Sequence, residues 1–422
     1  MTTDTKPSSA PPLEFKSEPP TASDPAVYAQ YEAKWAVYPT DADGWLQRAR
    51  DVAAVLSVDA AARDRANKSP LAEVALLKHS GLLRILGPKK YGGGEQPLSV
   101  GYQAIRAVAT GDGPEQIERT HKLIIENNYY VGGAVNPRDN DLAIEAGTDK
   151  FTFNGFKHFT TGAAVSDLLV LEGAINGAPE KHIFAIVPTK QEGIKFAYNW
   201  DNIGVRLTES GSATVTDVSA PWSDALGWNP STREPDPAFL LIPFASLLLP
   251  TIQLVFSNFY IGIARGALEA ARKYTTTSTR PWPYTGGDTK DKATDEHYIL
   301  ATYGNFFAHL RAAEALADRA GEETTKLYAK HADDHSTLTA RERGDLAEWV
   351  ASIKVVATDT ALRVTSGVFE VTGARATTAK NGFDRFWRDV RTHTLHDPVA
   401  YKNRELGRYF LLDEIPEPTW YT

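Results

Sequence analysis

The sequence predicts an α+β protein in which helical segments flank a small β-domain. Apolar residues recur at helical spacing early in the chain, as at Trp45, Ala49 and Val52. Short stretches of alternating apolar residues, separated by Gly and Pro, fill residues 129–232. Helical patterns return over residues 233–422. With 422 residues, the chain is long enough for two or three domains and a large core.

These patterns divide the chain into four segments. Residues 1–24 are rich in Pro, Ser and Thr and lack the apolar stretch of a secretory signal, so we expect a disordered tail there. A helical domain is expected over residues 25–128, a β-domain over 129–232 and a helical bundle over 233–422.

Helix positions follow from apolar spacing and from the placement of Gly and Pro. In the first helical domain we expect helices over Trp45–Arg63, from Pro70 to Gly81, and over Leu98–Val108. In the bundle we expect two long helices, roughly over Asp295–Tyr328 and Thr339–Val371.

The central domain shows strand patterns. Phe151 and Phe153 alternate before Asn154-Gly155, a dipeptide typical of a hairpin turn. The run Leu168–Leu171 predicts a buried strand. Alternation predicts two further strands, around Ile183, Ala185 and Val187 and around Ala213 and Val215.

The composition narrows the classes of function. A net charge of −8 gives no general attraction to nucleic acid or to anionic membranes, so neither is expected as a partner. The absence of cysteine excludes thiolate metal sites, iron–sulfur clusters and cysteine nucleophiles, and it is compatible with the cytoplasm. The uncharged run Phe239–Phe256 is long enough to span a bilayer, but Pro243, Pro250 and Gln253 favour a helix buried in a bundle.

The stretch from Asn381 to His396 carries residues suited to a site. Three arginines recur every three residues and would share one side of a helix, and two histidines follow them. Cationic groups that lead to titratable imidazoles suit an anionic cofactor with chemistry beside it. A solvated basic helix face would have the same spacing, so both interpretations stay open. These residues are Arg385, Arg388, Arg391, His393 and His396.

Other motifs are less specific. No phosphate loop and no G-x-G-x-x-G after a strand is present, which argues against a P-loop or Rossmann enzyme. His331 and His335 could share a helical side, but they lie in a very polar segment between two helices, so we expect no metal site. The run Lys157–Thr161 could hydrogen-bond a heterocycle. Arg280 could bind a phosphate or form a cation–π pair.

Several long stretches together resemble the acyl-CoA dehydrogenase superfamily. LLKHSGLLRILGPKKYGG (76–93) is similar to its N-terminal helix and turn, and FNGFKHFTTGAAVSDLLVL (153–171) to its strand beside the flavin. Within the superfamily the likeness is strongest to flavin-dependent monooxygenases of the dibenzothiophene monooxygenase type. It is carried by WDNIGVRLTESGS (200–212), QLVFSNFYIGIARGALEAARKYTTTSTRPW (253–282), SGVFEVTGARAT (366–377) and GFDRFWRDVRTHTLHDPVAYK (382–402).

The resemblance implies both a fold and an activity. The implied fold is acyl-CoA dehydrogenase-like, with an N-terminal helical domain, a central β-barrel domain and a C-terminal four-helix bundle, assembled as a homotetramer with shared active sites. The implied activity is that of a two-component, flavin-dependent monooxygenase. A separate flavin reductase would supply reduced FMN, or FAD. Oxygen would add at flavin C4a to give a hydroperoxide, which oxidises sulfur or nitrogen in a small aromatic or amine substrate.

The resemblance also assigns residues to the site. His396 matches a histidine beside the reactive edge of the flavin and Thr161 would help to hold the N5 region, so these two are the expected catalytic residues. Trp200 matches a wall of the substrate pocket. Ala374 and Arg375 match a cofactor contact that a neighbouring subunit delivers. The remaining expected cofactor contacts are Asn136, Lys157, His158, Phe159, Thr160 and Arg280.

Two alternative functions remain open. Many acyl-CoA dehydrogenases use a carboxylate base shortly after an Arg-Asp pair, and Asp397 could be that base here. A catalytically degenerate member of the fold is the other alternative, because residues 114–125 are shorter than the family helix expected after Gly113. Gly133 also stands where a close relative has an asparagine that contacts flavin.

Overall fold

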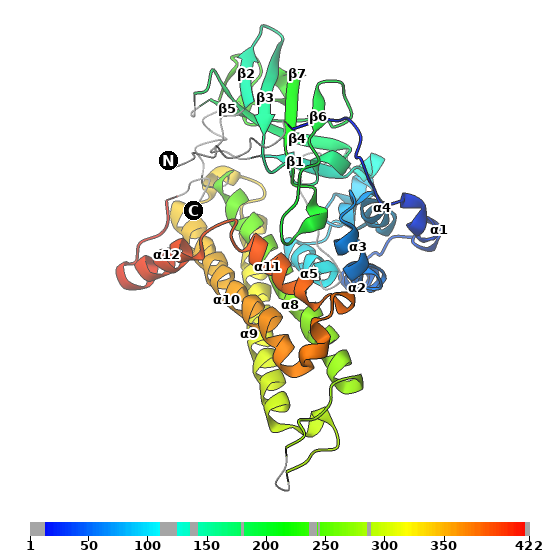
Figure 1. The fold of residues 1–422 in the computed structure, drawn as a ribbon. Helices are drawn as coiled ribbons and strands as arrows, with labels where there is room; N and C mark the ends of the chain where they lie inside the picture. The colour runs from blue at the N-terminus through cyan, green and yellow to red at the C-terminus, as the bar shows by residue number, and fades with distance from the viewer. Residues whose placement is uncertain are drawn as a thin grey trace, which may run out of the picture. The chain divides into compact units, whose positions relative to one another are not determined.

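A computed structural model describes residues 13–109, 125–135, 142–178, 181–235, 243, 245–284 and 288–417. The chain forms two compact units (Figure 1). The β-unit consists of residues 1–22, 131–201 and 208–234, and the helical unit of residues 23–130, 202–207 and 235–422. The helices before and after the β-unit in sequence therefore belong to one unit.

The β-unit contains a seven-stranded sheet with the order β1-β4-β2-β3-β7-β6, in which β5 pairs with β4. The alternation seen in the sequence is borne out by burial, since Ile183, Ala185 and Val187 face the core of the unit. The strands are β1 (Val131–Ala134), β2 (Leu142–Ala146), β3 (Lys150–Lys157), β4 (Leu168–Ile175), β5 (His182–Pro188), β6 (Ile194–Phe196) and β7 (Ala213–Pro221), with a short pair formed by β8 (Trp228–Asn229) and β9 (Glu234–Pro235).

The prediction of a hairpin turn at Asn154-Gly155 was wrong. Both residues lie inside β3, where the pairing with β7 shifts register between Phe153 and Gly155. The turn between β2 and β3 lies at Gly147, whose backbone N–H donates to Lys150 O. Gly155 has a φ of 141°, which suits an irregularity inside a strand. Asn-Gly favours unusual backbone angles, and a bulge uses them as readily as a turn does.

The N-terminal segment differs from the tail expected over residues 1–24. Its residues from Leu13 onward have defined contacts, whereas residues 1–12 lie outside the described part of the chain. The backbone of Lys16 both donates to and accepts from Phe196. Phe15 packs edge-on against Phe156, with ring centroids 5.9 Å apart. These contacts add a short extended segment to the β-unit.

The helical unit contains ten helices with bounds in its described residues, which mostly match the expected positions. Leu71–Ser80, Leu98–Ala109 and the two long helices confirm four predictions, whereas the helix expected over Trp45–Arg63 is two helices that are separated at Val58 and Asp59. The helices are α1 (Gln30–Lys34), α2 (Ala42–Ser57), α3 (Ala60–Ala66), α4 (Leu71–Ser80), α5 (Leu98–Ala109), α8 (Leu248–Thr277), α9 (His297–Lys330), α10 (Ala340–Thr372), α11 (Phe383–His393) and α12 (Val399–Leu412).

The core of the helical unit lies between α8, α9, α10 and α5. Many of its buried residues are alanines, among them Ala264, Ala313 and Ala357, and small side chains let helices approach closely. The buried Asn258 of α8 is hydrogen-bonded inside this core, because Arg106 donates twice to its Oδ1, at 2.9 and 2.8 Å. Within the described residues, no helix has the length and apolar character needed to cross a bilayer.

Candidate functional site

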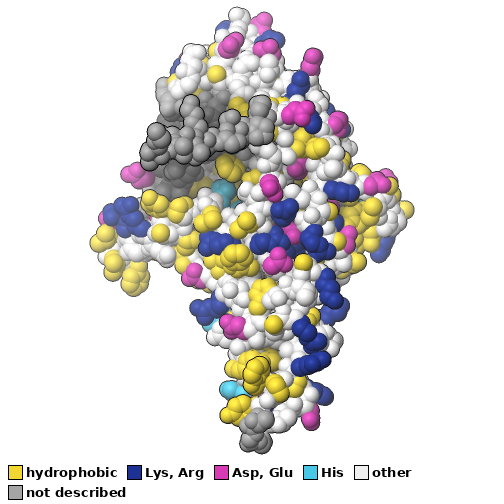
Figure 2. Space-filling view, viewed as in Figure 1, with side chains coloured by type: hydrophobic (Ala, Val, Ile, Leu, Met, Phe, Trp, Pro, Cys, Tyr) yellow, Lys and Arg dark blue, Asp and Glu magenta, His cyan; other side chains and the backbone are white. Residues whose placement is uncertain are grey.

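Helix α11 begins at Phe383, after the N-cap Gly382, and holds the three arginines of the Asn381–His396 stretch. Arg388 is engaged in ion pairs with Asp64 at 2.6 Å and with Asp384 at 2.9 Å, and it donates to Ile203 O. It therefore ties α11 to α3 and to the segment 202–207. Neither sequence interpretation describes Arg388, which is neither a solvated cation nor a free anion-binding group. Acidic and basic side chains are mixed over α11 (Figure 2).

The two histidines stack where α11 ends. His393 is the last residue of the helix, and the backbone N–H of His396 donates to His393 O at 3.0 Å. This single turn places the rings parallel, with 6° between their planes and 5.4 Å between their centroids. Phe256 of α8 packs edge-on against both rings. His396 remains open, with 58% of its side chain exposed.

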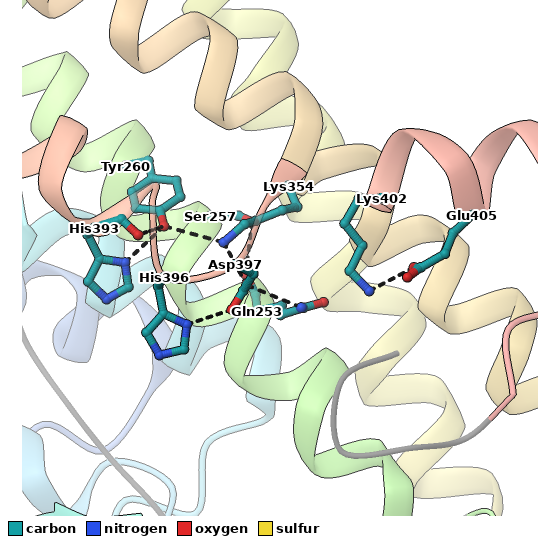
Figure 3. Close-up of polar contacts among 9 residues, drawn as sticks. All are labelled: Gln253, Ser257, Tyr260, Lys354, His393, His396, Asp397, Lys402 and Glu405. Atoms are coloured by element: carbon teal, nitrogen blue, oxygen red, sulfur yellow. Dashed lines mark hydrogen bonds and ion pairs between the residues drawn. The ribbon is translucent and has the colours of Figure 1, made fainter. Parts of the chain in front are cut away.

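Asp397 fixes the orientation of His396 (Figure 3). Its Oδ1 lies 2.5 Å from His396 Nδ1, and its Oδ2 accepts from Lys354 Nζ at 3.0 Å and from Gln253 Nε2 at 3.3 Å. Burial acts to raise the pKa of Asp397, but the hydrogen bond from His396 and the charge of Lys354 outweigh it and hold that pKa well below its ordinary value. An ionised carboxylate can only accept, so the shared proton is on Nδ1 and the free nitrogen of His396 is Nε2.

His393 is connected to the same lysine through Tyr260. The Tyr260 hydroxyl lies 2.9 Å from His393 Nδ1 and 3.1 Å from His393 O, and it accepts from Lys354 Nζ at 3.4 Å. Burial lowers the pKa of His393 well below its ordinary value, and the charges of His396 and Lys354 act in the same direction. Burial, followed by the charge of Asp397, raises the pKa of Tyr260. The inner imidazole is therefore neutral beside a protonated phenol, and the outer imidazole meets solvent.

The sequence did not identify Lys354, Tyr260 or Gln253 as members of this cluster. Gln253 and Tyr260 are spaced by seven residues in the uncharged part of α8 and share one side of it. Lys354 is a charged residue within a buried helical pattern. These polar interruptions of apolar faces were the available signal, but they name no partner.

In the β-unit, the expected flavin strand ends in strained backbone. Phe159 has a φ of 56°, an unusual value for an aromatic residue, and it is 61% exposed. Thr160 is buried and donates to Gly211 O at 2.9 Å. The Thr161 hydroxyl lies 2.9 Å from Ser210 Oγ, which lies 2.7 Å from Thr208 Oγ1. This hydroxyl chain holds Thr161 in place and leaves Phe159 projecting outward.

Two other expected site residues lie beside Phe159. Trp200 packs edge-on against its ring, with centroids 6.3 Å apart. His158 Nδ1 lies 3.2 Å from Ser212 Oγ. The structure therefore brings Trp200, His158, Phe159 and Thr161 together within the β-unit.

Lys157 does not present its ammonium group to a cofactor in this structure. Its side chain is fully buried, and Nζ lies 3.4 Å from Glu172 Oε2. The other carboxylate oxygen of Glu172 lies 2.6 Å from His182 Nδ1. Lys157 and His158 are neighbours in an extended segment, so their side chains point to opposite faces, and only one of them can face outward. The ion pair anchors the end of β3 just before Phe159.

The expected phosphate contacts lie at one end of the helical unit. Arg280 is exposed and has no partner among the residues that the structure describes. Arg375 donates from Nη2 to Ser278 O at 2.7 Å, which places it beside the segment that carries Arg280. Ala374 starts the same short 3-10 helix as Arg375. Asn136 and residues 110–124, which include most of the shortened stretch, lie outside the described residues.

The HADDH segment is split between two elements. His331 follows the end of α9 and its Nδ1 lies 2.7 Å from Thr337 Oγ1, whereas His335 starts a separate 3-10 turn. Within the described ranges, no group of three or more His, Asp or Glu side chains is arranged to hold a metal ion.

Known proteins similar to this chain share both its sequence and its fold. Residues 254–400 match the family "Acyl-CoA dehydrogenase, C-terminal domain". Dibenzothiophene monooxygenase of Mycolicibacterium goodii is 38% identical over 386 residues, covering 84% of this chain and 91% of that protein. The probable FMNH2-dependent monooxygenase SfnC of Pseudomonas putida is 34% identical over 395 residues, covering 89% and 96%.

Two solved structures agree with these matches. Methanesulfinate monooxygenase MsuC from Pseudomonas fluorescens superposes with a TM-score of 0.82 at 35% identity, over 89% of this chain and 99% of that one. FMN-bound TdsC from Paenibacillus sp. A11-2 gives a TM-score of 0.80 at 33% identity, over 90% and 100%. These matches confirm the fold that the resemblance implied. The chain belongs to the acyl-CoA dehydrogenase superfamily and, within it, to the flavin-dependent monooxygenases.

Proposed function

We propose that this protein is the oxygenase of a two-component system and uses reduced FMN and O2 to oxidise sulfur or nitrogen in a small aromatic or amine substrate. A separate reductase supplies the reduced flavin. The observation that carries the proposal is the open His396, whose Nδ1 is fixed by an ionised Asp397. A bound reduced flavin would supply the oxygen activation, and the residues of this chain would supply its orientation and the control of protons.

The residues present fit the phosphate end of a flavin. Arg280 is exposed with its guanidinium uncommitted among the described residues, and arginine is the side chain best shaped to hold a phosphate. Arg375 is beside the same segment, through its bond to Ser278. The resemblance gave Arg375 to a neighbouring subunit. Because both arginines belong to one end of one chain, we infer that a subunit which delivers one of them delivers both.

His396 is suited to proton control at the reactive edge of the flavin. Its Nδ1 is occupied by Asp397, so Nε2 is the nitrogen that meets a ligand. Imidazole exchanges protons near neutral pH, which suits general acid or base catalysis. In the β-unit, Thr161 is held by Ser210 and is proposed to position the N5 region. Asn136, His158 and Thr160 remain proposed cofactor contacts, and Lys157 contributes through the strand that it anchors.

The alternative of an acyl-CoA dehydrogenase is disfavoured by the surroundings of Asp397. A base that removes a carbon-bound proton needs a carboxylate of raised proton affinity. Asp397 instead accepts from Lys354, Gln253 and His396, and its pKa lies well below the ordinary value. This carboxylate acts as a fixed negative charge that orients an imidazole.

The pair of Phe159 and Trp200 favours an aromatic substrate. Their rings pack edge-on, and Phe159 is largely exposed, so a substrate ring can pack against Phe159. The solved relative TdsC has been seen with indole bound. We therefore use dibenzothiophene and indole as probes of this site, and methanesulfinate as a small non-aromatic comparison.

We also propose that the subunits assemble as a homotetramer. Helix α12 exposes four large apolar side chains, and hydrophobic atoms gather over it (Figure 2). Exposed apolar patches of this kind mark association surfaces. Light scattering is expected to give the mass of four chains of 46.2 kDa each. The four residues are Tyr401, Phe410, Leu411 and Leu412.

Rapid mixing of the protein and reduced FMN with O2 tests the proposed activity. The wild type is expected to accumulate an absorbing C4a-hydroperoxide and to convert dibenzothiophene to an S-oxide. His396→Ala is expected to lower product formation by about 100-fold or more, the usual effect of losing a general acid or base. His309→Ala is the matched control, because His309 is an exposed histidine of α9 that bonds only its own helix in the described structure. An oxygenase role would be untenable if neither protein formed an oxygenated flavin or product.

A further inference from the structure

Lys354 is a buried ammonium group at the base of the histidine pair. Its side chain is fully buried, and Nζ lies 3.0 Å from Asp397 Oδ2 and 3.4 Å from the Tyr260 hydroxyl. The same nitrogen lies over the rings of Phe256 and Tyr260, at 5.4 and 5.3 Å from their centroids. A cation is costly to bury unless it is paired. We therefore expect the charge of Lys354 to act on the groups that it contacts.

Asp397 divides its two oxygens between two groups that can be positive. One oxygen faces His396 at 2.5 Å and the other accepts from Lys354 at 3.0 Å. The single negative charge of Asp397 needs only one positive charge to balance it, on Lys354 or on His396. With Lys354 in place, His396 can keep its hydrogen bond to Asp397 while neutral. Without the ammonium group, the carboxylate would draw a second proton onto His396.

We propose that Lys354 is a positioning residue that sets the charge of His396 by supplying the counter-charge of Asp397. This inference rests on the proposed function, which assigns His396 to the flavin. Asp397 fixes the ring through Nδ1, and Lys354 offsets the proton affinity that the carboxylate would otherwise give to the ring. The Nε2 lone pair is thereby available to accept a proton or a hydrogen bond.

The other groups around His396 do not replace Lys354 in this role. His393 stacks on His396 from α11 and is kept neutral by burial, and Tyr260 of α8 keeps its proton. Gln253 of α8 carries no charge. Among the described residues, the other cations that act on the cluster are Lys402 of α12, which acts on Lys354, and Arg391 of α11, which acts on Tyr260.

Histidine NMR of the full-length, flavin-free protein tests this inference. Protein labelled with ¹⁵N-histidine is titrated with acid, and the signals of His396 are identified by their loss in His396→Gln. Lys354→Met and Lys354→Gln are both expected to raise the midpoint of the His396 titration by about one pH unit or more, because an opposite charge then acts on the imidazole uncompensated. Lys354→Gln retains hydrogen bonding to Asp397, so it remains informative if the methionine variant does not fold.

Lys402→Met is the matched control. Lys402 is also a buried lysine of the helical unit, but its Nζ is paired with Glu405 at 2.7 Å. It is expected to move the His396 midpoint by less than about a third of the shift in the Lys354 variants, because its charge is farther away. A folded Lys354 variant with an unmoved His396 midpoint would overturn the inference.

Product formation from reduced FMN and dibenzothiophene, measured against pH, separates the two proposals. In the Lys354 variants the acidic limb of the pH profile is expected to shift to higher pH, by as much as the NMR midpoint of His396 does. Wild-type protein that forms no product refutes the proposed function while the NMR result still decides the role of Lys354. If the wild type forms product but the variants show no NMR shift, the proposed role of Lys354 is refuted and the proposed function stands.

Discussion

Each unit of this protein contains a cluster in which one carboxylate joins a buried lysine to a histidine. In both clusters one carboxylate oxygen serves the lysine and the other serves the histidine Nδ1. The β-unit cluster is Lys157–Glu172–His182, and the helical-unit cluster is Lys354–Asp397–His396.

The two clusters differ in how much of the histidine reaches solvent. Glu172 is fully buried and the side chain of His182 is 15% exposed, whereas the side chain of His396 is 58% exposed. The β-unit cluster therefore closes on itself and holds strands together. The helical-unit cluster has the same connectivity but ends in an imidazole that a ligand can reach. The pattern of hydrogen bonds thus does not distinguish a structural ion pair from a candidate site, whereas the solvent exposure of the histidine does.

Lys157→Met is expected to give the largest effect, on stability. It leaves Glu172 fully buried without its ammonium partner, which typically costs about 3–5 kcal/mol. Urea unfolding measures the free energy of unfolding. The His396 titration is expected to be unchanged in the folded fraction. A loss below about 1 kcal/mol would mean that the β-unit cluster does not support its strands.

Asp397→Asn is expected to cost less, about 2–3 kcal/mol near neutral pH, because it leaves Lys354 buried without its counter-charge while Asp397 itself is partly exposed. The folded-state pKa of Asp397 is depressed, so its contribution is complete above the ordinary carboxyl value of 3.8 and is lost as the pH falls below it. The gap between wild type and variant should narrow in acid-unfolding experiments below that value. A gap independent of pH would contradict the charge pairing.

Glu348→Gln tests the opposite case, a buried carboxyl of α10 without a hydrogen-bond partner among the described residues. Glu348 is 5% exposed, and burial, followed by the charge of Glu405, raises its pKa to about 7. The folded state therefore holds this proton more tightly than the unfolded state, and stability is lost as the pH rises from the ordinary 4.5 through about 7. Above that pH range the variant should be more stable than the wild type by about 1–2 kcal/mol, and below it the two proteins should be nearly equally stable. Thermal unfolding at one pH above the range and one below it measures this difference.

Phe159→Gly is expected to have the smallest effect on stability. It should make the protein slightly more stable but weaken the binding of substrate. Glycine relieves the positive φ of Phe159, which should add about 0.5–1 kcal/mol to the free energy of unfolding. The same change removes the exposed ring beside Trp200 and should weaken binding of indole, which fluorescence titration measures. Unchanged indole binding would remove Phe159 from the proposed substrate wall.

Much of the secondary structure could be read from the sequence because its causes are local. The helices ending at Gly81 and beginning after Thr339 follow from capping and spacing, and α10 has the capping box of Thr339 and Glu342. The same locality explains the error at Asn154-Gly155, since a dipeptide that bends the backbone does not say whether the chain then reverses or continues. His396 was also proposed from the sequence, through its place in a stretch that resembles the family.

The sequence by itself predicted most of the element types and the family, and it singled out His396 as the proposed catalytic imidazole. Only the tertiary structure showed that Lys354, which was not singled out, pairs with the carboxylate that holds this imidazole, and that Lys157, expected at the cofactor, is buried in an ion pair. The physical reason is separation along the chain. Asp397 meets Lys354 across 43 residues and Gln253 across 144, and Tyr260 meets His393 across 133. Periodicity describes neighbours within a few turns, whereas these partners meet only because the packing of α8, α10 and α11 brings them together.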